Sequence, residues 1–179
     1  MKEIDFKHKM AAHCETGTVT SLLNHGGLDI TEPMVFGISS GIFFGYFESS
    51  NFSFPTFIVR NKPGSIRENI SKRLGVKFET YKFKDKTKGE QALNALIHKE
   101  IPTAAQVDFY YMDYMPEYQR VHINVHFINV VGMNETSYLI SDSYYPKKSE
   151  LKIQTLNKAR FAGGFMEPKG FLFYPSHIP

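Results

Sequence analysis

The sequence has one cysteine and no tryptophan among its 179 residues. One cysteine excludes an internal disulfide, which is typical of proteins from a reducing compartment, so we expect a cytoplasmic protein. Residues 1–7 include acidic side chains and lack the apolar segment of a secretory signal peptide, so we expect no such signal.

Long apolar runs and blocks of like charge are also missing. No apolar run approaches the roughly 20 residues that a membrane-spanning helix needs. The net charge is only +3, and lysines and arginines are scattered along the chain. We therefore expect neither a membrane nor a nucleic acid as partner.

Aromatic residues are abundant, with 16 phenylalanines and 10 tyrosines. They predict an aromatic-rich core or an aromatic-lined cleft. With 42% hydrophobic residues, a chain of this length can bury one substantial core. No repeat or linker divides the sequence, so we expect a single domain over residues 1–179.

The lone cysteine, Cys14, opens an apolar run of helix length over residues 14–25. Two glycines follow this run, as they often do at the end of a helix. We predict a helix with Cys14 in its first turn, where unpaired N–H groups and the helix dipole favour a thiolate. Free cysteines are usually core residues, but the polar neighbours His13 and Glu15 favour a nucleophile here.

A thiolate nucleophile needs a base, and the base needs a group that orients it. Residues 122–132 are the most β-like stretch, and residues 137–142 form the expected return strand of a hairpin. A turn centred on Asn134 would pair His126 directly with Asp142, on one face of the sheet. This register predicts that Asp142 orients His126 as the base.

Two other interpretations of the histidines stay open. His122 and His126 have the spacing of a helical zinc pair, but on a strand their Cα atoms lie about 13 Å apart. We therefore expect no metal and no other cofactor. The second alternative is that His126 is a hydrogen-bonded structural residue.

Residues 37–45 carry glycines spaced by four, which does not match a dinucleotide-binding fingerprint. We predict a turn-rich loop that either packs backbones closely or borders a cleft. On the second alternative, Gly41 and Phe44 are candidate substrate-binding residues.

The order of these features is typical of papain-like enzymes: a cysteine helix near the N-terminus, then a histidine on a strand, then an acid. We predict an α+β fold in which the cysteine helix packs on an antiparallel sheet. Its strands are expected near residues 104–111, 122–132, 137–142 and 170–174.

Several segments also resemble, in the expected order, the butirosin biosynthesis protein H N-terminal domain family. The main ones are residues 13–16, 32–37, 41–47, 107–111, 126–132, 141–142 and 156–160. The resemblance covers roughly residues 10 to 175. It implies a papain-like fold related to bacteriocin-processing cysteine peptidases. It also implies an acyltransferase of antibiotic or secondary-metabolite biosynthesis.

The resemblance further implies a Cys14 nucleophile, a His126 base and Asp142 as orienting residue. The donor would be an acyl carrier protein or another acyl thioester, and the acceptor a small amine, as in acylation of an aminoglycoside. A peptidase or amidase and a non-catalytic binding domain on the same fold are the alternatives. The family usually continues into a second, helical region, and the sequence stops at Pro179.

One position departs from the papain-like pattern. Such peptidases carry a glutamine six residues before the cysteine as an oxyanion donor, and His8 stands there in this chain. We expect the backbone N–H of Cys14 to contribute to an oxyanion hole, with His8 or Gln106 as side-chain candidates. Asp108 and Tyr110 are further candidates for substrate binding.

Overall fold

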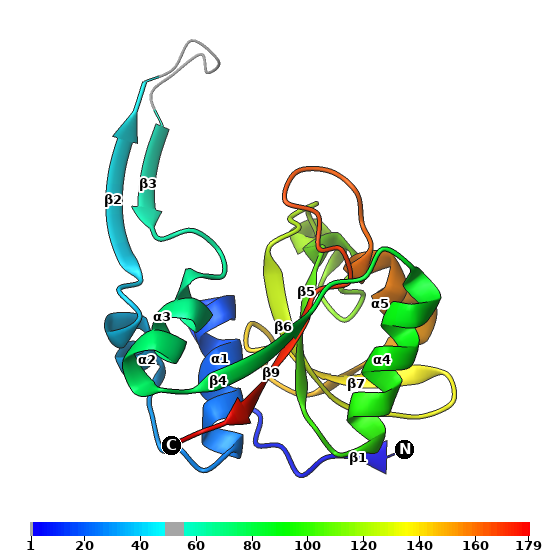
Figure 1. Ribbon diagram of the computed structural model, residues 1–179. Helices are drawn as coiled ribbons and strands as arrows, with labels where there is room; N and C mark the ends of the chain where they lie inside the picture. Colours follow the sequence, from blue (N-terminus) through cyan, green and yellow to red (C-terminus); the bar gives the residue numbers. More distant parts are fainter. Residues whose placement is uncertain (1, 49–55) are drawn as a thin grey trace.

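The computed structural model describes residues 2–48 and 56–179 (Figure 1). The helices are Cys14–His25 (α1), Glu32–Ile38 (α2), Ser65–Leu74 (α3), Lys86–His98 (α4) and Ile153–Arg160 (α5), with short 3-10 turns at Phe109–Tyr111 and Glu117–Gln119. The strands are Lys2–Glu3 (β1), Ile42–Phe47 (β2), Thr56–Arg60 (β3), Lys77–Tyr81 (β4), Thr103–Val107 (β5), His126–Met133 (β6), Ser137–Ser141 (β7), Ser149–Lys152 (β8) and Leu172–His177 (β9). Within these ranges, no helix combines the length and the hydrophobicity needed to cross a bilayer.

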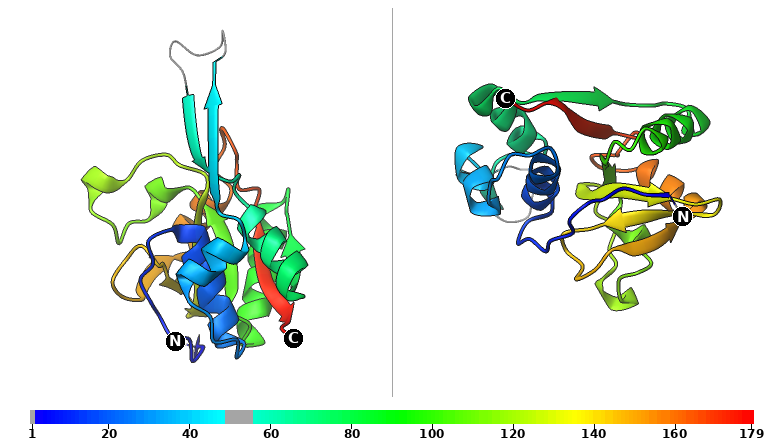
Figure 2. Two further views of the ribbon diagram at one scale, coloured as in Figure 1. Left: turned by 90° about the vertical axis from the view of Figure 1, so that its left-hand side faces the viewer. Right: turned by 90° about the horizontal axis from the view of Figure 1, so that it is seen from below.

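The main sheet has the strand order β4-β9-β5-β6-β7-β8, with β1 added against β6, and every strand pair in it is antiparallel. Figure 2 shows that the sheet is strongly curved, with β4 and β9 on one side and β6 to β8 on another. The predicted α+β fold, with the cysteine helix on an antiparallel sheet, is confirmed.

Two hydrophobic clusters lie on opposite faces of the sheet. Along β6, Phe127 and Val131 pack with α1 to α3, whereas Ile128 and Val130 pack with α4 and α5. This alternation is the expected consequence of the period of two along a strand. In Figure 1, α1 to α3 lie together on one side of β6, and α4 and α5 on the other. The helix that begins at Cys14 is therefore held against β6, which begins at His126.

The predicted register of the β6–β7 hairpin is wrong by two residues at Asn129 and Val130 and by three residues at Gly132 and Met133. Asn129 lies opposite Ser141 and Val130 opposite Ile140, and the register shifts between Val130 and Gly132. Such a shift indicates a β-bulge, in which one strand has an extra residue. The alternation of polar and apolar residues in the sequence does not predict where a bulge occurs. Because the error is an even number of residues on the side of the bulge where His126 and Asp142 lie, the predicted faces are still correct there.

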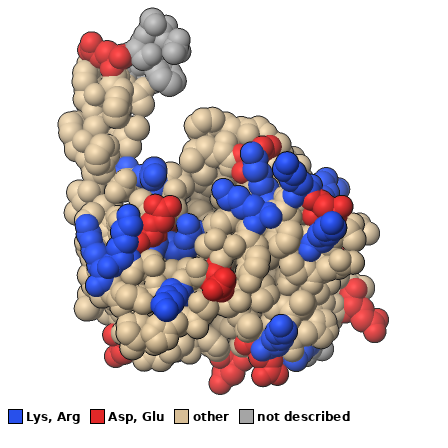
Figure 3. Space-filling model, in the orientation of Figure 1, with Lys and Arg blue, Asp and Glu red and all other residues tan. Residues whose placement is uncertain are grey.

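The expected loop over residues 37–45 is also wrong. Helix α2 continues to Ile38, and β2 then pairs with β3 in a separate two-stranded ribbon. The ribbon projects from the body of the molecule (Figure 1), and few charged side chains lie on it (Figure 3). A side chain at position 41 would collide with the ring of Phe36, so Gly41 allows a close approach at the base of the ribbon.

Two expected strands are shorter than the sequence pattern suggests. Strand β5 ends at Val107 because the next residue, Asp108, turns the chain: its carboxylate accepts hydrogen bonds from the backbone N–H groups of Tyr110 and Ile123. Strand β6 begins only at His126. The candidate base therefore lies at the first position of β6, at one end of a central strand.

Candidate active site

Helix α1 begins at Cys14, as predicted, and the residues before it are fixed by side chains. The N-cap is His13, whose Nδ1 accepts from the N–H of Thr16 at 3.3 Å. The Glu32 carboxylate accepts from the N–H groups of Ala12 and His13 at 3.0 and 2.9 Å. These contacts determine where the first turn of α1 places the sulfur.

The ring of His126 is buried and held from two sides. Its Nε2 lies 2.8 Å from Oδ2 of Asp142, so the predicted contact between these residues is present. The ring also meets Phe109 edge-on, with ring centroids 4.8 Å apart at 70°. This leaves Nδ1 as the ring nitrogen available to a group on α1.

The Asp142 carboxylate receives three hydrogen bonds. Besides His126, the hydroxyl of Tyr114 donates to Oδ2 at 2.8 Å and the N–H of Tyr144 donates to Oδ1 at 2.9 Å. Burial alone would raise the pKa of Asp142, but the charge of His126 and these hydrogen bonds lower it below its ordinary value. Asp142 is therefore a buried carboxylate anion at neutral pH.

His126 is the cationic partner of this pair. Burial acts to lower the pKa of His126, but the Asp142 carboxylate and the nearby Cys14 sulfur outweigh it and raise the pKa to about 10. A protonated imidazole beside a sulfur stabilises the thiolate form of that sulfur. His126 therefore presents an imidazolium to the Cys14 sulfur.

Cys14 and His126 open into the same cavity, which has a volume of about 400 Å³. The half-buried sulfur of Cys14 also lies 3.9 Å from the carbonyl oxygen of Val125. The residues that line the cavity are Ala12, His13, Cys14, Arg60, Phe109, Gln119, Val121, Ile123, Val125, His126 and Tyr144. Most of the wall beyond Cys14 and His126 is apolar.

A buried carboxylate and an arginine connect this cavity to the ribbon. Glu15 accepts from Nη2 of Arg60 at 3.2 Å and from the N–H of Gly64 at 2.9 Å. Arg60 also contacts the ring of His13, and burial together with Arg60 lowers the pKa of His13 to about 4. His13 is therefore neutral beside Cys14. The sequence marks Glu15 only as polar, and no local pattern points to Arg60.

The structure does not place either side-chain candidate for the oxyanion hole beside Cys14. His8 uses both ring nitrogens, Nδ1 with Oγ of Ser141 and Nε2 with the carbonyl of Tyr145, each at 2.9 Å. Gln106 donates from Nε2 to the carbonyls of Asn124 and Met166 at 2.7 and 3.1 Å and lines a different cavity. The spacing of His8 from Cys14 could not predict these contacts, because the partners of His8 and Gln106 are distant from them in sequence.

The other candidate binding residues lie outside the wall of the Cys14 cavity. Asp108 accepts from Nδ1 of His122 at 2.7 Å, and Tyr110 stacks on that ring with centroids 4.1 Å apart. These contacts support the segment that supplies Val121 and Ile123 to the wall. Gly41 and Phe44 belong to the ribbon instead, where Phe44 contacts the ring of Phe57.

The fold and the site define the class of papain-like cysteine enzymes. Within that class, the sequence matches the family model "Butirosin biosynthesis protein H, N-terminal" over residues 13–143. The chain therefore belongs to this family. The matched range includes both Cys14 and Asp142.

Solved structures agree on the fold. A C39-like protein from Bacillus anthracis, described as a peptidase, has a TM-score of 0.65 at 12% identity, covering 99% of this chain and 98% of that one. The peptidase domain of Streptococcus ComA, a bifunctional ABC transporter of a quorum-sensing pathway, has a TM-score of 0.57 at 16% identity, covering 95% and 97%. A comparison with curated protein sequences gives no match.

Proposed function

We propose that the protein is a cysteine-dependent acyltransferase. The observation that carries this proposal is the arrangement of Cys14 and His126 in one cavity, with His126 held by the buried Asp142 carboxylate. This arrangement supports Cys14 as nucleophile, His126 as base and Asp142 as the residue that orients the base.

In the first half of the reaction, the Cys14 thiolate attacks the carbonyl carbon of an acyl thioester. A bond forms between Sγ and that carbon, the carbon–sulfur bond of the donor breaks, and the departing thiolate takes the proton from Nδ1 of His126. In the second half, an amine attacks the acyl-cysteine carbonyl. His126 then accepts the amine proton as the Cys14 thiolate leaves.

Negative charge develops on the carbonyl oxygen in both steps. The N–H of Cys14 lies in the first turn of α1, where backbone donors have no partner within the helix. With His8 and Gln106 engaged elsewhere, this N–H and the positive end of the α1 dipole are the donors that we assign to the developing oxyanion.

The family supports a biosynthetic role, because the family is named for butirosin biosynthesis protein H. We therefore propose an acyl carrier protein or a comparable thioester as donor and a small amine as acceptor. A peptidase or amidase is the second candidate, and the similarity in fold to C39-like peptidases favours it. Both reactions share the acyl-Cys14 intermediate and differ in whether an amine or water releases the acyl group.

The test is the fate of that intermediate. The protein is acylated with an excess of butyryl-N-acetylcysteamine, freed of reagent, and divided between buffer and buffer containing a primary amine. For a transferase, loss of the adduct accelerates with amine concentration and yields the amide. If the adduct is lost at the same rate with and without the amine and yields only free butyrate, the hydrolase alternative is correct. Cys14→Ser is the control for adducts formed elsewhere.

A further inference from the structure

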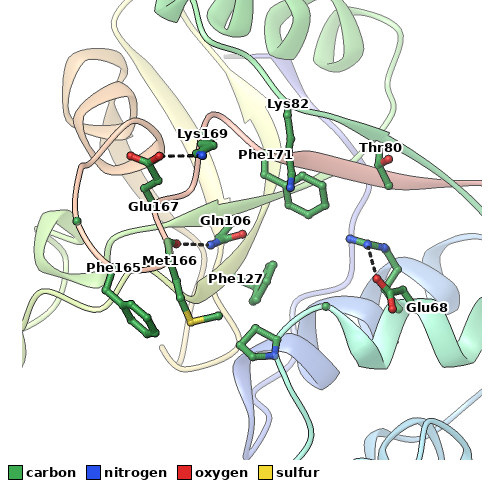
Figure 4. Close-up of a pocket in the computed structure, with 14 residues that line it drawn as sticks. Glu68, Thr80, Lys82, Gln106, Phe127, Phe165, Met166, Glu167, Lys169 and Phe171 are labelled. Carbon is green, nitrogen blue, oxygen red and sulfur yellow. Dashed lines mark hydrogen bonds and ion pairs between the residues drawn. The ribbon is translucent and has the colours of Figure 1, made fainter. Parts of the chain in front are cut away.

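A second and larger cavity, of about 690 Å³, lies between the start of α3, strand β4 and the segment before β9. Figure 4 shows its labelled side chains, with Phe127 near the centre and Phe171 beside Lys82. Phe127 and Phe171 are buried and supply an aromatic floor. Above this floor, the cavity carries the cations Arg67, Lys82 and Lys169.

Arg67 is the most enclosed of these cations, with 14% of its side chain exposed. Its guanidinium lies over the rings of Phe171 and Phe173, 5.0 and 5.2 Å from their centroids. The nearest carboxylate oxygen, on Glu68, is 3.9 Å away, which is too far for a hydrogen bond. Among the described residues we find no acceptor hydrogen-bonded to this guanidinium, so its N–H groups are available to a ligand.

Lys82 adds a second cation over the same aromatic ring. Its Nζ lies 5.5 Å from the centroid of Phe171. No carboxylate lies within 4 Å of this amine in the described part of the chain. Lys169 differs, because Glu167 pairs with it at 2.9 Å. Arg67 and Lys82 are thus the two cations whose charge the protein itself compensates least.

This combination selects a ligand by charge and by shape. A guanidinium binds a carboxylate or phosphate through two parallel hydrogen bonds, and a neighbouring ammonium adds a point charge. The aromatic floor favours an apolar body next to the anionic group. Glu68 and Glu167 also line the cavity, but three cations outnumber these two carboxylates. The net positive charge favours an anionic group over a protonated amine.

Two residues of the cavity wall are linked to Cys14 and His126: one is the chain neighbour of His126, and the other is hydrogen-bonded to the chain neighbour of Cys14. Phe127 follows His126 on β6, with its side chain on the opposite face of the strand. Gly64 lines the cavity, and its N–H donates to Glu15, the residue after Cys14. Phe127 and Gly64 belong to the wall of this cavity, whereas Cys14 and His126 line the other one. The two cavities have no lining residue in common, so a donor that uses both must be long enough to pass from one to the other.

We propose that the second cavity binds an anionic group of the acyl donor, a carboxylate or phosphate carried on an apolar body, through Arg67 and Lys82. This inference rests on the proposed acyl transfer for its assignment to the donor. Two sources supply the same chemistry: a carboxylate at the far end of the acyl group, or the phosphate of a phosphopantetheine arm.

Binding is tested first without chemistry, in the Cys14→Ser variant. Calorimetry compares glutaramate, which carries a terminal carboxylate, with the neutral butyramide, and 4′-phosphopantetheine with pantetheine. We expect one anionic probe to bind more tightly than its less charged counterpart. Loss of hydrogen bonds to a charged group should weaken that binding about 10- to 100-fold in Arg67→Gln and Lys82→Gln. Lys72→Gln is the matched control, because it removes an exposed cation from the same helix outside the cavity.

The same variants are then tested for acylation by glutaryl and butyryl N-acetylcysteamine and by butyryl-phosphopantetheine. A preference for the glutaryl thioester that Arg67→Gln abolishes identifies the acyl carboxylate, and a preference for phosphopantetheine identifies the carrier arm. Lys82→Gln keeps the test decisive if Arg67→Gln does not fold. Equal binding of charged and neutral probes, or a preference that survives both substitutions, overturns the inference. Intact binding without acylation by any thioester overturns the proposed acyl transfer instead.

Discussion

His126 and Asp142 form a buried ion pair although they do not lie opposite each other in the β6–β7 hairpin. The register that pairs Asn129 with Ser141, continued by one residue, places Asp142 opposite Ile128. His126 lies two residues further along the same face, and a diagonal neighbour at that distance is within reach of a long side chain. The 2.8 Å contact from Nε2 to Oδ2 is thus made across the diagonal, just beyond the end of β7.

The electrostatic role of His126 predicts a change in the reactivity of the sulfur. Replacing His126 with Ala removes the cation that stabilises the Cys14 thiolate. We expect iodoacetamide to alkylate Cys14 at least about tenfold more slowly at neutral pH in this variant, as loss of a nearby opposite charge predicts. Mass spectrometry of the Cys14 peptide follows the reaction. An unchanged rate in a variant with unaltered circular dichroism would show that the two side chains are not paired.

The ion pair also predicts how the stability of the protein depends on pH. The pKa of His126 is raised from 6.5 to about 10, so its contribution is complete below pH 6.5 and is lost as pH rises through about 10. The pKa of Asp142 is lowered from 3.8, so its contribution is present above pH 3.8 and is lost as pH falls through the lowered value.

Asp142→Asn tests this dependence. The free energy of unfolding of the natural sequence should exceed that of the variant most clearly between pH 3.8 and 6.5. The difference should shrink as the pH approaches about 10. Urea unfolding across this range measures it. A difference that stays constant from acid to alkaline pH would contradict the pairing of charges.

The close packing around Gly17, three residues after Cys14, predicts that a larger side chain is not tolerated there. A Cβ at this position would lie 2.5 Å from Cβ of Ala11 and 2.6 Å from Oγ of Ser143. Gly17→Ala should therefore displace the segment that leads to Cys14 and cost about 1–3 kcal/mol of stability. Gly37→Ala is the matched control, because nothing lies within 4 Å of a Cβ built there. Thermal unfolding compares the two, and equal stability would contradict this prediction.

Local signals in the sequence were enough to predict the fold class, the helix that begins at Cys14 and the strand faces of His126 and Asp142. The helix at Cys14 has an apolar run, a capping residue and terminal glycines, all within a short segment. The faces of β6 and β7 on the side of His126 and Asp142 follow from a period of two, which survives an error of two residues in register. These features depend on neighbours in the chain, so a single sequence displays them.

The remaining parts of the site depend on contacts between distant segments. The bulge between Val130 and Gly132 has no periodic signature, so the register could not be predicted. His8 forms a hydrogen bond with Ser141, which lies 133 residues away in sequence, and Arg60 donates to Glu15, which lies 45 residues away. No spacing rule relates residues so far apart, so the engagement of His8 and the place of Arg60 became visible only in the folded chain.

The most direct test of the account is acylation of Cys14 by a thioester. Purified protein is mixed with butyryl-N-acetylcysteamine, quenched at timed intervals and digested, and the acylated peptide is identified by mass spectrometry. The account predicts a single butyryl group on Cys14, absent from Cys14→Ser and formed about 10² to 10⁴ times more slowly in His126→Ala. Acylation of Cys14 at an undiminished rate without His126, or no acylation of Cys14 at all, would contradict it.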